Sequence, residues 1–166
     1  GFGGFFLPLI PSIRLGEIMA GIVCIAQTSE VSLSAATAKT VIQVVAASNH
    51  KVKVLRWGVF FDGTSATAEP VQVRLLRQST AGTMSSLTPV KQTTDSETVH
   101  TTAQHTATAE PTAGDVLDIC EVHPQSGYEV VLTPDNYIWV AGGGRIGIEC
   151  TAPATVNVRA KIVFEE

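Results

Sequence analysis

The chain is poor in charged residues, in aromatic residues and in cysteine. Charged residues make up 16% of its 166 residues, below the usual quarter, and the net charge is −4 at pH 7. A weakly acidic chain with few basic residues has no electrostatic means of attracting nucleic acid or an anionic membrane surface. We therefore expect neither nucleic acid nor a membrane among its partners.

Cysteine is represented by Cys24, Cys120 and Cys150 alone. An odd number of cysteines without a C-x-x-C pair argues against a disulfide framework. Free cysteine packs as a small apolar residue, and two of the three lie in apolar runs. We predict three reduced thiols, with Cys150 in the core beside Ile146 and Ile148.

The sequence also lacks the patterns of familiar catalytic and metal sites. His100 and His105 lie near Asp95 and Glu97, but the spacing matches no zinc pattern and the surroundings are polar. The glycines at 142–144 are not followed by a Lys-Ser/Thr pair, and no G-x-S-x-G motif occurs. We expect a protein that is not an enzyme and that needs no metal and no cofactor.

Alternation of apolar and polar residues is the main positive signal, and it is the pattern of β-strands with one buried face. No stretch has a helical period. The main strands are expected at 19–27, 37–47, 51–62, 71–78, 116–122 and 145–164, with shorter ones between turn clusters. Short strands separated by turns predict an all-β fold, an antiparallel β-sandwich that is jelly-roll-like and has eight to ten short strands.

The last twenty residues predict a closing β-hairpin. Two alternating runs, at 145–151 and 156–164, are separated by four residues that include Pro153. Pairing of these runs would place Glu149 near Arg159 or Lys161.

A second, longer hairpin is predicted at 51–78, with its loop at 63–70. Within its first strand the apolar phase changes at Val54-Leu55. That change indicates either a β-bulge or a central strand buried on both faces.

Residues 79–115 hold almost no large apolar side chain and are rich in Thr, Ser and Ala. We expect a long loop here, with short strands at 87–91 and 99–104. Because such a segment has little apolar surface to offset its ordering entropy, contact with a neighbouring subunit is expected to order it.

Residues 1–18 differ in character from the single domain expected at 19–166. Phenylalanine and leucine are crowded among glycines, and Pro8 and Pro11 exclude a regular helix. One interpretation is an extended arm whose Phe5 and Phe6 dock on a neighbouring subunit. The other is a reading frame extended upstream of a true start at Met19, since the preceding Gly-Glu-Ile can be encoded by a sequence similar to a ribosome-binding site. Either way, we predict that these residues are not part of the sandwich core.

The aromatic residues of the domain fall into two groups. Trp57 lies in a strongly apolar strand and is expected in the core. Tyr128, Tyr137 and Trp139 lie near the end of a sheet and are the candidates for contact with a subunit or a partner.

Several running phrases, among them WGVFFDGTSATAEPVQVRLLRQ and GGRIGIECTAPATVNVRAKIVFEE, resemble small structural proteins of tailed bacteriophages. The resemblance covers about residues 37–166 and carries no catalytic signature. It implies a virion protein assembled in the host cytoplasm, most simply a capsid decoration or cement protein. Its implied partners are copies of itself, in a homo-oligomer and by analogy a trimer, and the major capsid protein or another virion protein. The alternatives are a carbohydrate-binding β-sandwich module and a fibre or tail component that binds a receptor.

Overall fold

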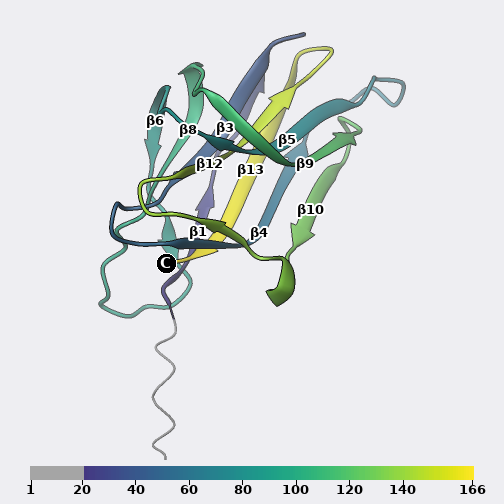
Figure 1. The fold of residues 1–166 in the computed structure, drawn as a ribbon. Coiled ribbons are helices and arrows are strands. Elements are labelled where there is room, and N and C mark those ends of the chain that lie inside the picture. The colour runs from purple at the N-terminus through teal and green to yellow at the C-terminus, as the bar shows by residue number, and fades with distance from the viewer. Residues whose placement is uncertain (1–20) are drawn as a thin grey trace, which may run out of the picture.

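The computed structural model describes residues 21–166 as two antiparallel β-sheets packed face to face (Figure 1). No α-helix occurs within these residues, and one 3-10 turn, η1, covers Pro134–Asn136. The expected all-β sandwich is therefore confirmed, with thirteen strands in the described part of the chain instead of eight to ten.

The seven-stranded sheet, called the large sheet below, has five strands in sequence across it and two short ones beside them. In order these are β10 (Gly127–Val131), β4 (Val52–Phe61), β13 (Val156–Glu165), β1 (Val23–Gln27) and β7 (Val90–Lys91), with β11 (Ile138–Val140) on β4 and β2 (Val31–Leu33) on β13.

The six-stranded sheet, called the small sheet, packs against it. Its order is β6 (Thr83–Leu87), β8 (Thr102–Ala109), β3 (Ala38–Val45), β12 (Arg145–Thr151), β5 (Val71–Gln78) and β9 (Ala113–Val122).

Four of the strand pairs are nested in the sequence. β1 pairs with β13, β3 with β12, β4 with β10 and β5 with β9, so that early strands meet late ones. The strands β6, β7 and β8 lie between β5 and β9 in the chain; β7 adds to the large sheet beyond β1, and β8 and β6 add to the small sheet beyond β3. Consecutive strands therefore tend to belong to different sheets.

This topology shows that both predicted hairpins are wrong. β12 pairs with β3 and β5 in the small sheet, whereas β13 pairs with β1 and β4 in the large one. The four residues between β12 and β13 cross from one sheet to the other, and Ala152 forms a bridge with Ala35 at that crossing. In the same way, β4 and β5 face each other across the core.

The predicted ion pair of Glu149 is wrong for the same reason. Glu149 lies in the small sheet and binds Arg74 on β5, with 3.1 Å between Arg74 Nε and Glu149 Oε1. Arg159 and Lys161, on the large sheet, bind Glu30 and Glu129.

The phase change within β4 is a β-bulge. Val163 of β13 pairs with Arg56 and Phe164 pairs with Val54, so Leu55 has no partner on β13. Val54 and Trp57 are both buried on either side of this extra residue. One of the two interpretations of the phase change, the bulge, is therefore correct.

The core lies between the sheets and contains the residues expected there. Trp57 is fully buried, and Cys150 is buried with Ile146 and Ile148 in one cluster, as predicted. All three cysteines are free thiols; Cys24 is buried and Cys120 is half-buried. Burial raises the pKa of the Cys24 and Cys120 thiols to about 11.

The expectation of a long loop at 79–115 is wrong. Strands β6, β7 and β8 occupy much of this segment, and β8 pairs with β3 over Thr102–Val45 to His105–Ile42. Small residues suffice here because β8 lies between β3 and β6, and the backbone hydrogen bonds of a strand need partner strands and no large side chain. The segment is thus ordered by its own chain and needs no neighbouring subunit for that.

Candidate partner-binding face

The outer face of the large sheet, directed away from the core, carries an apolar row across five strands. The row follows direct cross-strand pairs and consists of Val131, Val163, Ile25 and Val90, with Arg56 between Val131 and Val163. Val131 and Val90, at its two ends, are 71% and 65% exposed, whereas Val163 in its centre is 6% exposed. Exposed branched residues at both edges of one sheet face are candidates for an interaction surface.

An aromatic cluster lies beside this row, at the end of the sheet near the C-terminus. The ammonium group of Lys53 lies 5.2 Å from the ring centre of Tyr137 and 5.6 Å from that of Trp139. Its Nζ atom is also 2.6 Å from Glu165 Oε2. Trp139 remains 54% exposed, and such a ring beside a fixed cation provides a rigid contact surface.

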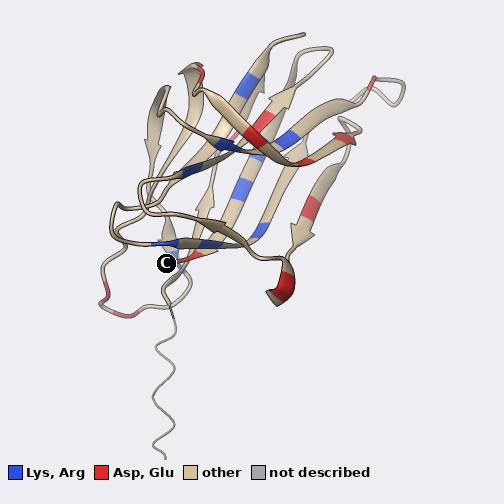
Figure 2. Cartoon of the chain, in the orientation of Figure 1, with Lys and Arg blue, Asp and Glu red and all other residues tan. Residues whose placement is uncertain are grey.

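Charged groups on this face pair with one another. Glu129 accepts from Lys161 Nζ at 2.6 Å and lies 3.3 Å from Arg56 Nε. The hydrogen bond from Lys161, more than any other cause, lowers the pKa of the Glu129 carboxyl. Figure 2 shows basic residues along β4 and β13 and acidic residues on β10. The face is therefore electrostatically self-balanced.

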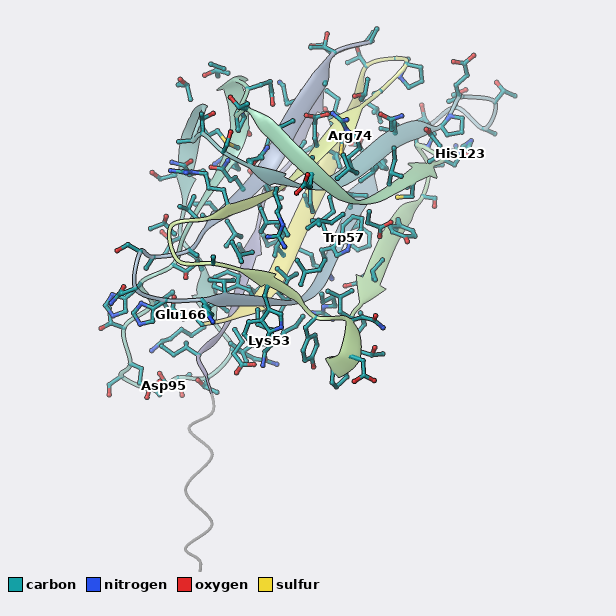
Figure 3. The ribbon with its side chains drawn as sticks, viewed as in Figure 1. Lys53, Trp57, Arg74, Asp95, His123 and Glu166 are labelled. Carbon is teal, nitrogen blue, oxygen red and sulfur yellow. The ribbon has the colours of Figure 1, made fainter. Side chains whose placement is uncertain are left out.

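The structure brings together two of the predicted contact residues and separates the third. Tyr137 and Trp139 share Lys53 on the outer face. Tyr128 lies on the inward side of β10, where its ring is 5.5 Å from that of Trp57. Figure 3 shows Trp57 between the two sheets. Tyr128 thus packs on the core, while Phe5 and Phe6 lie outside the described residues.

Sequence reasoning missed Phe60, Val131 and Val90, all exposed on this face. A signal for the face was present at Val163, which interrupts the alternation of β13 by placing an apolar residue among Arg159, Lys161 and Glu165 on the outer side. Its neighbours in space come from strands far apart in sequence, so the row could not be assembled without the topology.

The outer face of the small sheet has a different character, because polar side chains are buried on it. Gln43 Nε2 donates to Gln78 Oε1 at 2.7 Å, and Gln78 Nε2 donates to Thr40 Oγ1 at 2.9 Å. Gly147 lies beneath the Gln78 carboxamide: a Cβ atom there would be 2.4 Å from Gln78 Oε1. Glu149, only 6% exposed, binds Arg74 on the same face.

Part of the cover over this polar face comes from the connection between β8 and β9. The chain passes here from beside β3 to the far side of β5. Glu110 Oε2 accepts from the Thr40 backbone N–H at 2.8 Å, and the Ser79 N–H donates to Thr112 O at 3.0 Å. These bonds hold the connection against β3 and the end of β5, while Val116 and Ile119 on the edge strand β9 remain exposed.

The two histidines considered in the sequence, His100 and His105, have different neighbours. His100 stacks on His50, with ring centres 4.9 Å apart, and its backbone N–H donates to Glu166 at 2.7 Å. His105 instead lies beside Thr106, with 2.9 Å between Nδ1 and Oγ1. No group of three potential metal-ligating residues occurs between residues 21 and 166. The stacked histidines join the turn after β3 to the segment before β8.

The carboxyl group of Glu166 fixes that segment to the end of β13. It accepts the backbone N–H groups of His100 and Thr101, each at 2.7 Å. Partial burial raises the pKa of Glu166, but the hydrogen bonds from Thr101 and His100 outweigh burial and leave the pKa below its usual value.

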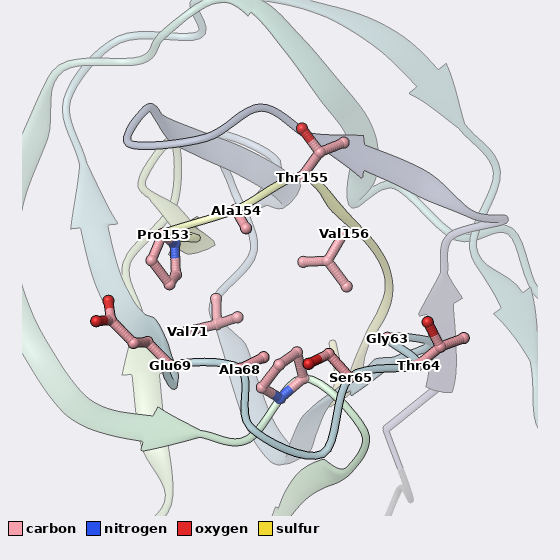
Figure 4. A pocket seen from close by; sticks show the side chains of 11 residues that line it. Gly63, Thr64, Ser65, Ala68, Glu69, Val71, Pro153, Ala154, Thr155 and Val156 are labelled. Atoms are coloured by element: carbon pink, nitrogen blue, oxygen red, sulfur yellow. The ribbon is translucent and has the colours of Figure 1, made fainter.

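A pocket opens at the other end of the sandwich, between the loops that cross from sheet to sheet (Figure 4). Its volume is about 290 Å³, and Val71, Pro124 and Val156 are the buried residues in its wall. Glu69 is the only charged residue that lines it. The lining contains no cysteine or histidine and no second carboxylate, so it offers no acid–base pair.

No family model, no curated protein and no solved structure matches this chain. Within the described residues, no helix has the length and apolar character needed to cross a membrane.

Proposed function

We propose that the chain is a non-enzymatic structural protein of a bacteriophage virion, of the capsid decoration or cement type. In this proposal it binds the shell through the outer face of the large sheet. The partner is the major capsid protein or another virion protein.

The nested strand pairing is the observation that carries the proposal. A jelly roll pairs its first strand with its last, its second with its second last, and so on inward. Eight strands of this chain follow that order, β1, β3, β4 and β5 pairing with β13, β12, β10 and β9. We therefore infer a jelly roll with β6, β7 and β8 as an insertion.

Jelly rolls occur in viral capsid proteins, in lectins and in cupins, so this order favours a virion or binding role without deciding between them. The likeness of residues 37–166 to phage structural proteins supports the first. The exposed apolar row supports a protein partner, because fully desolvated apolar residues at the centre of an interface supply most of its binding energy.

We further propose a homo-oligomer, with a trimer as the favoured form. The order seen at 79–115 no longer argues for it, because that segment pairs within its own chain. The support is the amount of apolar surface left open on one face, which closed cyclic symmetry can cover without unlimited growth. Sedimentation at micromolar concentration is expected to give a mass near three subunits.

Co-sedimentation with shells tests the function. Shells assembled from the major capsid protein of the same genome are expected to carry the wild-type protein through a sucrose cushion. The double variant Val131→Ser/Trp139→Ala is expected to stay in the supernatant. Ile119→Ser is the matched control, since Ile119 is 56% exposed on the small sheet. Wild-type protein that never sediments with shells would contradict the proposal.

Carbohydrate binding is the second candidate, favoured by the exposed Trp139 ring beside Tyr137. Sugars stack on such rings in many β-sandwich modules. A glycan array that gives Trp139-dependent binding, together with no binding to shells, would select this function, including that of a receptor-binding fibre or tail component.

A further inference from the structure

We propose that the pocket at the loop end of the sandwich binds a lysine side chain of a protein partner. The pocket encloses the apolar stem of that side chain, and the carboxylate of Glu69 binds its ammonium group. This inference goes beyond the proposed function and does not rest on it, because none of the residues assigned above to the outer face of the large sheet lines the pocket.

The walls of the pocket belong to three connections that are bonded to one another. Gly63, between β4 and β5, donates its backbone N–H to Pro124 O, between β9 and β10, at 2.7 Å. Asn157, which follows the connection from β12 to β13, donates its backbone N–H to Asp62 Oδ1 at 3.2 Å. The pocket is therefore formed before a ligand arrives, and little conformational entropy is lost when one binds.

The buried part of the wall is apolar and the exposed part is polar. Val71, Pro124 and Val156 are buried and have only carbon atoms in their side chains. The exposed part adds the hydroxyl groups of Thr64, Ser65 and Thr155 (Figure 4). The volume of about 290 Å³ lies at the lower limit of ligand pockets, which is about 300 Å³, so the pocket suits a single side chain.

Glu69 supplies the only charge in the lining, and it forms no ion pair among residues 21–166. Pro70 follows it and restricts its backbone to extended conformations, which limits where the carboxylate lies. A carboxylate beside an apolar wall selects a cation with an apolar stem, as in lysine and arginine. One carboxylate with hydroxyl groups nearby suits the compact ammonium group of lysine better than the five donors of a guanidinium group.

The chain contains a second copy of the sequence around Glu69, and the glutamate of that copy binds a donor. Ala-Thr-Ala-Glu-Pro occurs at 66–70 and again at 107–111. In the second copy, Glu110 Oε2 accepts the backbone N–H of Thr40 at 2.8 Å. The carboxylate of Glu69 has no corresponding N–H donor in the described part of the chain, so it is available to a donor from another molecule.

Methyl NMR of the full chain tests the inference. The probe is Nα-acetyl-lysine N-methylamide, and the matched norleucine derivative has the apolar stem without the ammonium group. We expect the lysine derivative to shift the methyl signals of Val71 and Val156 at millimolar concentration. At low salt it is expected to bind about fivefold more tightly than the norleucine derivative. In about 1 M salt, which screens exposed charges, the two affinities are expected to become equal.

Two substitutions separate the contribution of the charge from that of the cavity. Glu69→Gln is expected to weaken binding of the lysine derivative about fivefold, to the level of the norleucine derivative. Ala154→Leu is expected to fill the pocket and abolish binding of both. The matched control, Asp115→Asn, removes an exposed carboxylate of β9 that does not line the pocket and is expected to change neither affinity. Glu69 is exposed and lies outside the strands, so Glu69→Gln keeps the test decisive if Ala154→Leu does not fold.

Three results would overturn the inference. The first is equal affinity for the lysine and norleucine derivatives at low salt, since the pocket would then not recognise a cation. The second is undiminished binding of the lysine derivative by Glu69→Gln, since the charge that binds it would then lie elsewhere. The third is the absence of any shift at Val71 and Val156 with the probe at tens of millimolar.

Discussion

The outer faces of the two sheets differ in how far the chain's own residues cover them. On the small sheet, Gln43, Gln78 and Glu149 are buried, and the connection from β8 to β9 helps to cover them. On the large sheet, Val131 and Trp139 stay exposed, and only the charged residues have found partners. A buried polar side chain must form its hydrogen bonds within the fold. An exposed apolar side chain, in contrast, lowers the free energy when a partner removes it from water.

This difference indicates that the outer face of the small sheet contributes to stability, whereas the outer face of the large sheet is available for binding. Substitutions on the small sheet are expected to change the free energy of unfolding. Substitutions on the large sheet are expected to change binding and leave that free energy almost unaltered.

The largest effect on stability is expected from Glu149→Gln. The substitution leaves Arg74 without its carboxylate on a face where Glu149 is buried, so we expect a loss of about 2–3 kcal/mol in the free energy of unfolding. Urea denaturation measures it. The matched control, Glu165→Gln, breaks a more exposed pair on the large sheet and is expected to cost less than about 1 kcal/mol. Equal losses would remove the distinction between the faces.

A smaller effect is expected from Gly147→Ala. The added methyl group would displace the Gln78 carboxamide and with it the hydrogen bonds to Gln43 and Thr40, at a cost of about 1–2 kcal/mol. A double-mutant cycle checks the cause, because in a Gln78→Ala background the same substitution should cost much less. Additive losses would show that Gln78 is not the residue displaced.

The variant Val131→Ser/Trp139→Ala is expected to change the free energy of unfolding by no more than about 0.5 kcal/mol, because neither side chain is in the core. Thermal and urea unfolding measure this. A loss above about 2 kcal/mol, like that of a core substitution, would mean that the aromatic cluster holds β11 onto β4.

The smallest effect is expected from removal of residues 1–18. The melting temperature of the chain that starts at Met19 should stay within a few degrees of that of the full chain, as expected for a segment outside the core. Calorimetry of both chains checks this. A collapse in stability would show that Phe5 and Phe6 are core residues after all.

Sequence reasoning located most strands and gave a bulge as one of two interpretations of the phase change at Val54-Leu55, because alternation of apolar residues reports directly which positions are buried. It misassigned the partners of β12 and β13, since four residues that include Pro153 suit a hairpin and a crossing between sheets equally well. Period two gives the buried face of a strand and does not say to which sheet the strand belongs.

The candidate face was predicted only in part. Tyr137 and Trp139 were found from aromatic content, whereas Tyr128 was placed with them although it pairs with Val59, not near Lys53, and faces the core. The segment at 79–115 was predicted to be a long loop because it has almost no large apolar side chain. The strand β8 within it is held mainly by backbone pairing with β3, which needs no such side chain.

The position of β13 has a consequence for synthesis of the protein. This strand lies in the middle of the large sheet and pairs with β4 on one side and with β1 on the other. The strands β4 and β1 do not pair with each other. The large sheet therefore cannot close before β13 has been synthesised, and until then Val59, Trp57 and Ala26 have no neighbour on that side. A nascent chain stalled before Val156 is thus expected to be a substrate for chaperones and proteases.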